Sequence, residues 1–309
     1  MKKDISIITV NYNSHKYIEN CLNSIISNTR DINYEILIVD NYSPDRDIIN
    51  LKSKFSNIEF YLLDDNRGFG SACNYGSQNS SGKYLVFVNP DTVFTNNSLK
   101  NMFDFMEQTT DAAVCSPAFI YQDGSQGYVY NNFPNIMWEF YDFLGKGYNL
   151  RINKLNRKLQ ESAKSGRAMR IDWATGACLI VKKDFFNKVG GFNEDYFLYY
   201  EDVDLQKRIT DAGGSIYCLP YLKVIHVANT STKPDDDDTV YYYNINKSRL
   251  MYHMKNSSTF KKLFVKYLHL AGFYLRLFSL KFRSRYSEKK NMKKLQYMNI
   301  IKYYRTGLE

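Results

Sequence analysis

The feature that most constrains the fold of this chain is a repeated alternation of strand-like and helix-like segments. Residues 5–10 are a short run of apolar, mostly β-branched residues, and residues 17–27 then follow an amphipathic helical pattern. Residues 35–39 and 44–55 repeat this pair. Alternation at this spacing predicts right-handed crossovers and a mainly parallel sheet covered by helices on both faces. The first four predicted strands are residues 5–10, 35–39, 58–63 and 84–88.

A polar residue follows each of these strands: Asn11, Asp40, Asn66 and Asp91. The carboxyl ends of parallel strands meet at one edge of the sheet, where open α/β folds bind their ligands. We therefore expect these four side chains to converge on one site. A nicotinamide-dependent oxidoreductase would share the alternation, but the first turn lacks the Gly-x-Gly-x-x-Gly motif that binds pyrophosphate there.

Two strand ends, at Asp91 and His226, carry candidate ligands for a metal, and the loop before the third predicted helix carries candidate ligands for a phosphate. Asp91 follows a proline, so rigid backbone can present its carboxylate to a divalent metal. The alternative is an aspartate that only stabilises a turn. His226 also ends an apolar segment and is either a ligand or a structural histidine. Arg67 and Gly68 precede a predicted helix, where a guanidinium and backbone amides can bind phosphate.

Three carboxylates occur within four residues at Glu201, Asp202 and Asp204. A cluster of like charges raises the proton affinity of at least one member, which suits a general base. The alternative is a charge cluster that only stabilises a helix N-terminus. On a helix Glu201 and Asp204 share a face and Asp202 points elsewhere. Upstream, residues 171–181 predict one strand, and residues 151–164 predict a basic helix in an otherwise irregular stretch.

Together these motifs resemble the inverting glycosyltransferases of family 2, over about residues 4–231. The resemblance implies a GT-A-type fold, which is α/β with a Rossmann-like, mixed and mainly parallel sheet and helices on both faces. A C-terminal helical extension follows it. The matching motifs are Thr9-Val10-Asn11-Tyr12-Asn13, Val39-Asp40-Asn41, the segment 66–76 that begins Asn66-Arg67-Gly68-Phe69-Gly70, Asn89-Pro90-Asp91, Trp173-Ala174-Thr175-Gly176-Ala177 and Tyr200-Glu201-Asp202-Val203-Asp204-Leu205.

The resemblance also implies roles for individual residues. Asp202 would be the general base, and Asp91 with His226 would hold Mg²⁺ or Mn²⁺ on the diphosphate of the donor. One position departs from the family pattern, because Asn89 stands where the family has the first aspartate of its Asp-x-Asp motif. The residues expected to support the base are Glu201, Asp204, Trp173, Gly176 and Ala177. Those expected to bind the nucleotide sugar are Thr9, Val10, Asn11, Asp40, Asn66, Arg67, Gly68 and Asn89.

The same motifs suggest the substrates. Asn-Pro-Asp combined with Asn-x-Gly-Phe-Gly resembles bacterial rhamnosyltransferases, so we expect dTDP-L-rhamnose as donor. The expected acceptor is a hydroxyl of a glycan or lipid-linked glycan in cell-surface polysaccharide synthesis. Two alternatives remain open: a UDP-hexose-dependent transferase of the same fold, and a non-catalytic nucleotide-sugar-binding protein. The acidic run at residues 234–238 is expected to be a solvated loop, and its position after His226 also allows it to close over the bound donor.

The net charge of +9 is unevenly distributed along the 309 residues. From Lys247 to the end there are 16 basic and 2 acidic residues, whereas the upstream part is mildly acidic, which argues against nucleic acid as a partner. We therefore predict a catalytic domain over residues 1–245, with a nucleotide-binding half to about residue 110 and an acceptor-binding half over 111–245. A basic helical segment over residues 246–309 would follow.

Within that segment, residues 261–280 are mainly apolar, with one narrow polar stripe at helical spacing. Two interpretations remain open: a helix lying in the plane of an anionic membrane surface, or one packed on the catalytic domain or on another subunit of a homo-oligomer. No secretory signal precedes residue 5, and five scattered cysteines indicate neither a disulfide framework nor a zinc site. We expect a cytoplasmic protein, peripheral on the inner face of the membrane in the first interpretation. The stripe consists of Lys262, Lys266, His269 and Arg276.

Overall fold

The computed structural model describes residues 3–44, 48–127, 129–144, 147–227, 238–282 and 288–306. The chain divides into two compact units. The sheet unit comprises Met1–Phe133, Leu155–Phe197 and Glu201–Lys233, and the helical unit comprises Pro134–Lys154, Leu198–Tyr200 and Pro234–Glu309. This division differs from the predicted boundary at residue 245, because two segments distant in sequence join the C-terminal helices.

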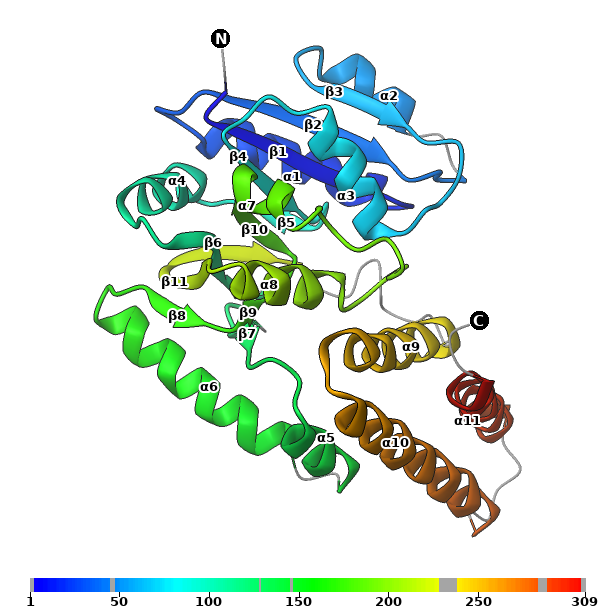
Figure 1. Cartoon of the computed structure of the whole chain (residues 1–309). Helices are drawn as coiled ribbons and strands as arrows, with labels where there is room; N and C mark the ends of the chain where they lie inside the picture. Colours follow the sequence, from blue (N-terminus) through cyan, green and yellow to red (C-terminus); the bar gives the residue numbers. More distant parts are fainter. Residues whose placement is uncertain are drawn as a thin grey trace. The chain divides into compact units, whose positions relative to one another are not determined.

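The first half of the sheet unit is parallel, as the alternation of strands and helices predicts (Figure 1). β1 lies between β2 and β4, and β2 also pairs with β3, in each case in parallel. Helical crossovers make this possible because parallel neighbours need long connections. The strands are β1 (Ile5–Asn11), β2 (Tyr34–Asp40), β3 (Glu59–Leu62) and β4 (Tyr84–Val88), and the helices are α1 (His15–Asn28), α2 (Ile48–Lys54) and α3 (Phe69–Gln78).

The second half makes the sheet mixed. β10 runs antiparallel between β4 and β6, β11 is parallel to β6, and β5 pairs antiparallel with β11. The strand order of the main path is β3-β2-β1-β4-β10-β6-β11-β5, with β8 also pairing with β11. The remaining strands of this sheet are β5 (Thr92–Val93), β6 (Ala112–Ile120), β8 (Met169–Ile171), β10 (Cys178–Lys182) and β11 (Ser215–His226).

The prediction of one strand over residues 171–181 is wrong. The chain leaves β8 at Asp172, whose Oδ2 accepts hydrogen bonds from the backbone of Phe133 and the side chain of Asn132. It then forms the short β9 (Trp173–Ala174), which pairs with β7 (Tyr130–Asn131), before β10 begins. Residues 175–177 therefore lie in a connection between two strands, not inside one.

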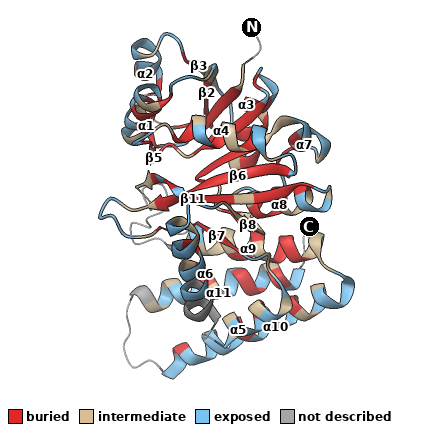
Figure 2. Ribbon diagram, turned by 90° about the vertical axis from the view of Figure 1, so that its left-hand side faces the viewer, coloured by how far each residue is buried: buried red, intermediate tan, exposed pale blue. Residues whose placement is uncertain are grey.

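Side chains on both faces of the sheet are buried, which explains the nearly continuous apolar strands (Figure 2). Along β1 the faces alternate: Ile5 and Ile7 pack with α1, α2 and α4 (Ser98–Gln108), and Ile8 and Val10 pack with the other layer. That second layer consists of α3, α7 (Lys183–Lys188) and α8 (Glu201–Asp211). The predicted α/β fold with helices on both faces is confirmed.

The helical unit has its own core, formed by buried residues that include Leu250, Leu270, Phe273, Ile300 and Tyr304. One helix in the described part of the chain, extending over residues 259–282, is long and apolar enough to cross a membrane by length and composition. The helices are α5 (Ile136–Phe143), α9 (Asp238–Asn256), α10 (Thr259–Ser279), continued by a 3₁₀ turn (Leu280–Phe282), and α11 (Glu288–Thr306). α6 (Gly147–Lys164) contains the predicted basic helix and contributes residues to both units.

Candidate active site

The ends of β1 and β2 carry the first polar cluster of the site. Asn11 lies opposite Asp40 in the parallel register, and its Nδ2 donates to Oδ1 of Asp40 at 2.6 Å. Ser43 donates to the same carboxylate from its hydroxyl at 2.7 Å and from its backbone nitrogen at 3.0 Å. The Asp40 carboxylate is therefore held in one orientation at the carboxyl end of the sheet. The sequence analysis did not include Ser43, although its position three residues after a strand-terminal aspartate is typical of a turn.

A second cluster shapes the loop between β3 and α3. Asn41 Nδ2 donates to Asn66 Oδ1 at 2.8 Å, and Asn41 Oδ1 accepts from the backbone of Arg67 at 3.1 Å. Gly68 has a positive φ of 85°, and a Cβ there would collide with the carbonyl oxygen of Phe197, so only glycine fits. Asn66 and Gly68 thus lie where they were predicted, and Asn41 joins them as a residue that the site prediction omitted.

The guanidinium of Arg67 is engaged locally, because its Nε donates to Oδ1 of Asp65 at 2.5 Å. The side chain of Arg67 is 50% exposed and that of Asp65 is 63% exposed. An exposed ion pair of this kind contributes little stability and exchanges readily. Arg67 is therefore free to change partner when an anion of higher charge binds.

The two predicted metal ligands lie next to each other. Nε2 of His226 is 3.2 Å from Oδ1 of Asp91. The antiparallel pairing of β11 with β5 sets this position, since His226 lies opposite Thr92 and the nitrogen of Val227 donates to the carbonyl of Asp91 at 3.0 Å. Asp91 is almost fully buried, whereas the His226 side chain retains 20% exposure. The pair therefore offers one carboxylate and one imidazole to the same point.

These two donors fit a Mg²⁺ or Mn²⁺ ion that a donor diphosphate completes. Such ions are commonly held by one or two protein side chains together with substrate phosphates rather than by a full protein cage. Among the described residues no group of three or more His, Cys, Asp or Glu side chains is arranged to hold a metal by itself. One carboxylate and one imidazole therefore fit a metal ion that is also bound by the phosphates of a nucleotide.

Asp202 is oriented by two backbone amides. Gly176 N donates to its Oδ2 at 2.9 Å, and Val203 N donates to its Oδ1 at 2.8 Å. A Cβ at residue 176 would lie 3.3 Å from both Cβ and Oδ2 of Asp202, so glycine allows this approach. Asp202 is partly exposed, in contrast to its neighbours Glu201 and Asp204, which are buried.

The connection between β9 and β10 links Asp202 to the metal-ligand pair. The carbonyl of Ala177 accepts from Asn89 N at 2.9 Å and from Thr92 Oγ1 at 3.2 Å. The preceding residue, Gly176, holds Asp202. Asn89 and Thr92 flank Asp91 in sequence. Asp202 and the two residues that flank Asp91, more than one hundred residues apart in sequence, therefore contact the same two-residue segment.

Glu201 is buried beside Asp202, and its Oε2 has no hydrogen-bond partner in the described part of the chain. Burial, and then the charge of Asp202, raise the pKa of Glu201 well above its usual value. Burial also raises the pKa of Asp202, although the amides of Gly176 and Val203 oppose that rise. Both directions agree with the expectation from clustered carboxylates. Glu201 therefore binds its proton more tightly than an ordinary glutamic acid does, and Asp202 is the member that reaches solvent.

Asp204 and Trp173, which were also predicted to support the base, contact other residues. Asp204 points away from Asp202 and accepts from Arg208 Nε at 2.7 Å, which makes it part of a structural ion pair. Gln206, which the prediction omitted, bonds both the nitrogen and the oxygen of Ala174 and so ties α8 to β9. Trp173 donates from Nε1 to the carbonyl of Asn132 at 3.0 Å, which holds its ring beside the residue that follows β7.

Two predicted nucleotide-binding residues lie inside the protein. The side chain of Thr9 is fully buried, and its hydroxyl has no hydrogen-bond partner among the described residues. Val10 is 7% exposed and belongs to the core. Neither residue therefore presents a polar side chain to the site. The acidic run at 234–238, predicted to close over the donor, lies outside the described residues, apart from the backbone of Asp238.

Comparison with protein families identifies two matching models. The model described as "Glycosyl transferase family 2" matches residues 6–175. A second model, described as "N-terminal domain of galactosyltransferase", matches residues 157–230. The two matches together cover the strand ends, the Asn-Pro-Asp segment, the carboxylate cluster and His226.

Two curated relatives are similar over most of their own length. The N-acetylglucosaminyl-diphospho-decaprenol L-rhamnosyltransferase of Mycobacterium tuberculosis is 25% identical over 244 residues, covering 75% of this chain and 78% of the relative. The rhamnosyltransferase WbbL of Escherichia coli is 27% identical over 238 residues, covering 73% of this chain and 84% of the relative.

Two solved structures share the fold at low identity. The crystal structure of GalNAc-T7 with UDP, GalNAc and Mn²⁺ aligns with a TM-score of 0.57 and 15% identity over 73% of this chain. The alignment spans 43% of that structure, so this chain covers less than half of it. The structure of S. aureus TarS 1-349 aligns with a TM-score of 0.52 and 16% identity, over 96% of this chain and 81% of that one.

Proposed function

Because the chain belongs to glycosyltransferase family 2, we propose that it transfers L-rhamnose from dTDP-L-rhamnose to a hydroxyl group, with inversion at the anomeric carbon. The proposed acceptor is a glycan or lipid-linked glycan of a bacterial cell-surface polysaccharide. The rhamnosyltransferases among the relatives support this donor. The observation that carries the mechanism is that two adjacent residues contact both parts of the site. Gly176 donates to Asp202, and the carbonyl of Ala177 accepts from the residues that flank Asp91.

Asp202 is the proposed general base. An acceptor hydroxyl must lose its proton as its oxygen attacks the anomeric carbon from the face opposite the leaving diphosphate. Burial raises the proton affinity of Asp202, and the amides of Gly176 and Val203 keep its carboxylate in a fixed orientation. Burial and the charge of Asp202 raise the pKa of the neighbouring Glu201, which favours its neutral form beside the Asp202 carboxylate.

Asp91 and His226 are the proposed ligands of a divalent metal, Mg²⁺ or Mn²⁺. Bound there with the donor, the metal would neutralise the charge that develops on the departing diphosphate. Asn89, which replaces the first aspartate of the family motif, leaves the region near the ribose with one negative charge fewer. We expect affinity for the free metal to be weak and to rise with bound nucleotide.

Asp40 and Asn11 form the proposed contact with the nucleotide base. Oδ1 of Asp40 accepts from Asn11 and Ser43, and among the described residues Oδ2 accepts one hydrogen bond, from the backbone of Ser43. A carboxylate oxygen can accept a second hydrogen bond, and the ring N–H of thymine is a suitable donor. Uracil carries the same N–H, so this contact alone does not separate dTDP from UDP donors.

A donor screen tests the proposal. The purified chain would be incubated with dTDP-L-rhamnose or UDP-hexoses and Mn²⁺ or Mg²⁺, and release of the nucleoside diphosphate would be measured. We expect release from dTDP-L-rhamnose, increased by metal and lost with EDTA. Preferential release from a UDP-hexose would instead support the alternative donor class. Tight donor binding without release or transfer to any glycan acceptor would support the non-catalytic binding protein.

A further inference from the structure

Helix α10 directs a polar side chain inward. His269 Nε2 lies 2.8 Å from Oε2 of Glu139, a residue of α5 that is 2% exposed. His253 Nε2 of α9 lies 2.8 Å from the other oxygen of the same carboxylate, and Arg249 forms an ion pair with it. A buried carboxylate with three such partners is costly to separate from them. The polar side of α10 at His269 is thereby fixed toward the interior of the helical unit.

The opposite face of α10 is apolar and exposed. Residues three, four and seven apart share one face of a helix, and the large exposed side chains follow that spacing. In Figure 2 this helix is pale blue over much of its length. Among these residues Phe260 is 75% exposed and Tyr267 is 63% exposed. The apolar face comprises Phe260, Leu263, Tyr267, Tyr274, Leu275, Phe278 and Phe282.

The exposed apolar face is additional to the apolar stripe that α10 buries, since Leu270 and Phe273 pack in the core of the helical unit. Exposed apolar patches of this kind mark interaction or membrane sites on soluble proteins. An ordinary surface helix exposes polar side chains opposite the stripe that it buries, whereas α10 exposes Phe260, Tyr267 and Phe278 there. The face is therefore expected to be covered by something other than water.

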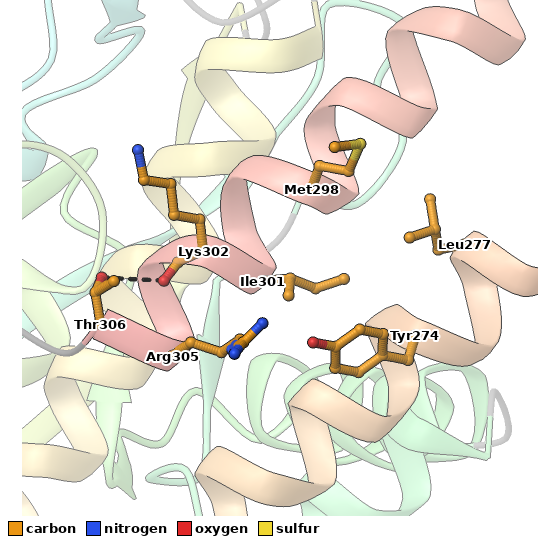
Figure 3. Close-up of a pocket in the computed structure, with 7 residues that line it drawn as sticks. All are labelled: Tyr274, Leu277, Met298, Ile301, Lys302, Arg305 and Thr306. Atoms are coloured by element: carbon orange, nitrogen blue, oxygen red, sulfur yellow. Dashed lines mark hydrogen bonds between the residues drawn. The ribbon is translucent and has the colours of Figure 1, made fainter.

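Positive charge surrounds the apolar face. No aspartate or glutamate occurs between residues 239 and 287, and Lys261 and Lys281 at the two ends of the face are exposed. Beside it, an open groove of about 490 Å³ between α10 and α11 contains both apolar side chains and cations. Figure 3 shows the guanidinium of Arg305 reaching toward Tyr274, with Ile301 between the two helices. Lys302 lines the same groove.

We propose that this face of the helical unit docks on the surface of an anionic lipid bilayer, with α10 lying in the plane of the membrane. Apolar side chains would enter the boundary between headgroups and acyl chains, and the surrounding cations would contact lipid phosphates. The inference concerns the helical unit alone and requires neither the proposed donor nor the proposed acceptor.

Two other occupants fit less well. A second copy packed through the same face would bring two sets of cations together, because a two-fold interface places each patch against itself. A helix that spans the bilayer would have to expose His269 and separate it from Glu139, although its length and composition permit spanning. Docking in the plane keeps the polar contacts of α10 and covers its apolar face.

Co-sedimentation of the full chain with vesicles tests the proposal. We expect binding to vesicles of phosphatidylcholine and phosphatidylglycerol in equal amounts, little binding to phosphatidylcholine alone, and weaker binding as NaCl is raised. Leu275→Gln combined with Phe278→Gln should lower binding at least about tenfold, because both side chains leave the apolar phase. The matched control is Ile26→Gln with Ile49→Gln, two residues of similar exposure in the sheet unit, and it should bind as the unchanged chain does.

A second variant and two controls guard against misfolding and the other occupants. Lys302→Gln with Arg305→Gln changes exposed cations and should weaken binding to anionic vesicles several-fold, with unchanged far-ultraviolet circular dichroism. An alkaline carbonate wash should release the bound chain. Equal binding by all variants, or failure to bind anionic vesicles, would overturn the proposal. Retention after carbonate would indicate a spanning helix, and a lipid-free dimer abolished by Leu275→Gln with Phe278→Gln would indicate a second copy; either result contradicts surface docking.

Discussion

The backbone nitrogen of Gly176 donates a hydrogen bond to Oδ2 of Asp202 at 2.9 Å, and the absence of a side chain at residue 176 allows this contact. A Cβ there would come to 3.3 Å of the same oxygen, a contact tight enough to displace the carboxylate by a few tenths of an ångström. We predict that Gly176→Ala lowers kcat about tenfold, since small misplacements of a catalytic group are costly. Steady-state kinetics on the variant, and on the double variant with Asp202→Asn, measure this. If the two changes multiply instead of overlapping, Gly176 does not act through Asp202.

Asp202→Asn removes the proposed base while keeping its shape. We predict a fall in kcat of about 10²- to 10⁴-fold with little change in the affinity for the donor, as general base catalysis implies. Asp211→Asn, at an exposed position on the same helix α8, is the matched control and should retain full turnover. Turnover of the Asp202 variant within a factor of a few of the unchanged enzyme would exclude this residue as the base.

The Asp91–His226 pair predicts metal-dependent nucleotide binding. Isothermal titration with dTDP should show that Mn²⁺ tightens binding by about tenfold or more, because the metal neutralises the diphosphate. Asp91→Asn should abolish that gain, and His226→Gln should reduce it. Asp123→Asn changes an exposed turn aspartate and should leave the gain intact. A metal effect of equal size in the Asp91 variant would place the metal elsewhere.

Glu201 predicts how stability depends on pH. Its pKa is raised by burial and by Asp202, so the folded chain binds this proton more tightly than the unfolded chain does. The stabilising effect is complete below the ordinary Glu pKa of 4.5 and is lost as the pH rises through the folded value. Each pKa unit of difference is worth about 1.4 kcal/mol.

Thermal unfolding between about pH 5 and about pH 8 measures this effect. The unchanged chain should lose stability across this range, and Glu201→Gln, which carries no proton to lose, should lose less. A smaller slope will remain in the variant because the pKa of Asp202 is raised as well. Identical slopes for the two proteins would mean that Glu201 is not the residue that holds the proton.

The sequence predicts the parallel half of the sheet well because its determinants are local. Each strand there is a continuous apolar run, and the polar residue that ends it stands beside it in the chain. Asp40, Asn66 and Asp91 were proposed as site residues for this reason. The predicted strand over residues 171–181 failed because its interruption depends on Asp172 meeting Asn132 and Phe133, about forty residues earlier. No local pattern carries that contact.

Residue roles that depend on distant partners were harder to predict. Asp204 belongs to the same cluster as Asp202, yet it serves an ion pair with Arg208, and only the direction of each side chain on α8 separates the two. The helical period of α10 was visible in the sequence, but its orientation was not. It depends on Glu139, which lies 130 residues before His269. Likewise, residues 134–154 and 198–200 join the helical unit through contacts that the chain order conceals.

The close approach of Gly68 to the carbonyl of Phe197 bears on the order in which substrates bind. The nitrogen of Phe69 donates to the carbonyl of Phe197 at 3.1 Å, and Gly68 leaves no room for a side chain against that carbonyl. Phe197 lies four residues before Glu201, so the turn that would meet the donor phosphates is joined to the peptide leading into the base. We therefore predict that a donor that displaces Gly68 also displaces the peptide leading into Asp202, so that the sugar nucleotide binds before the acceptor.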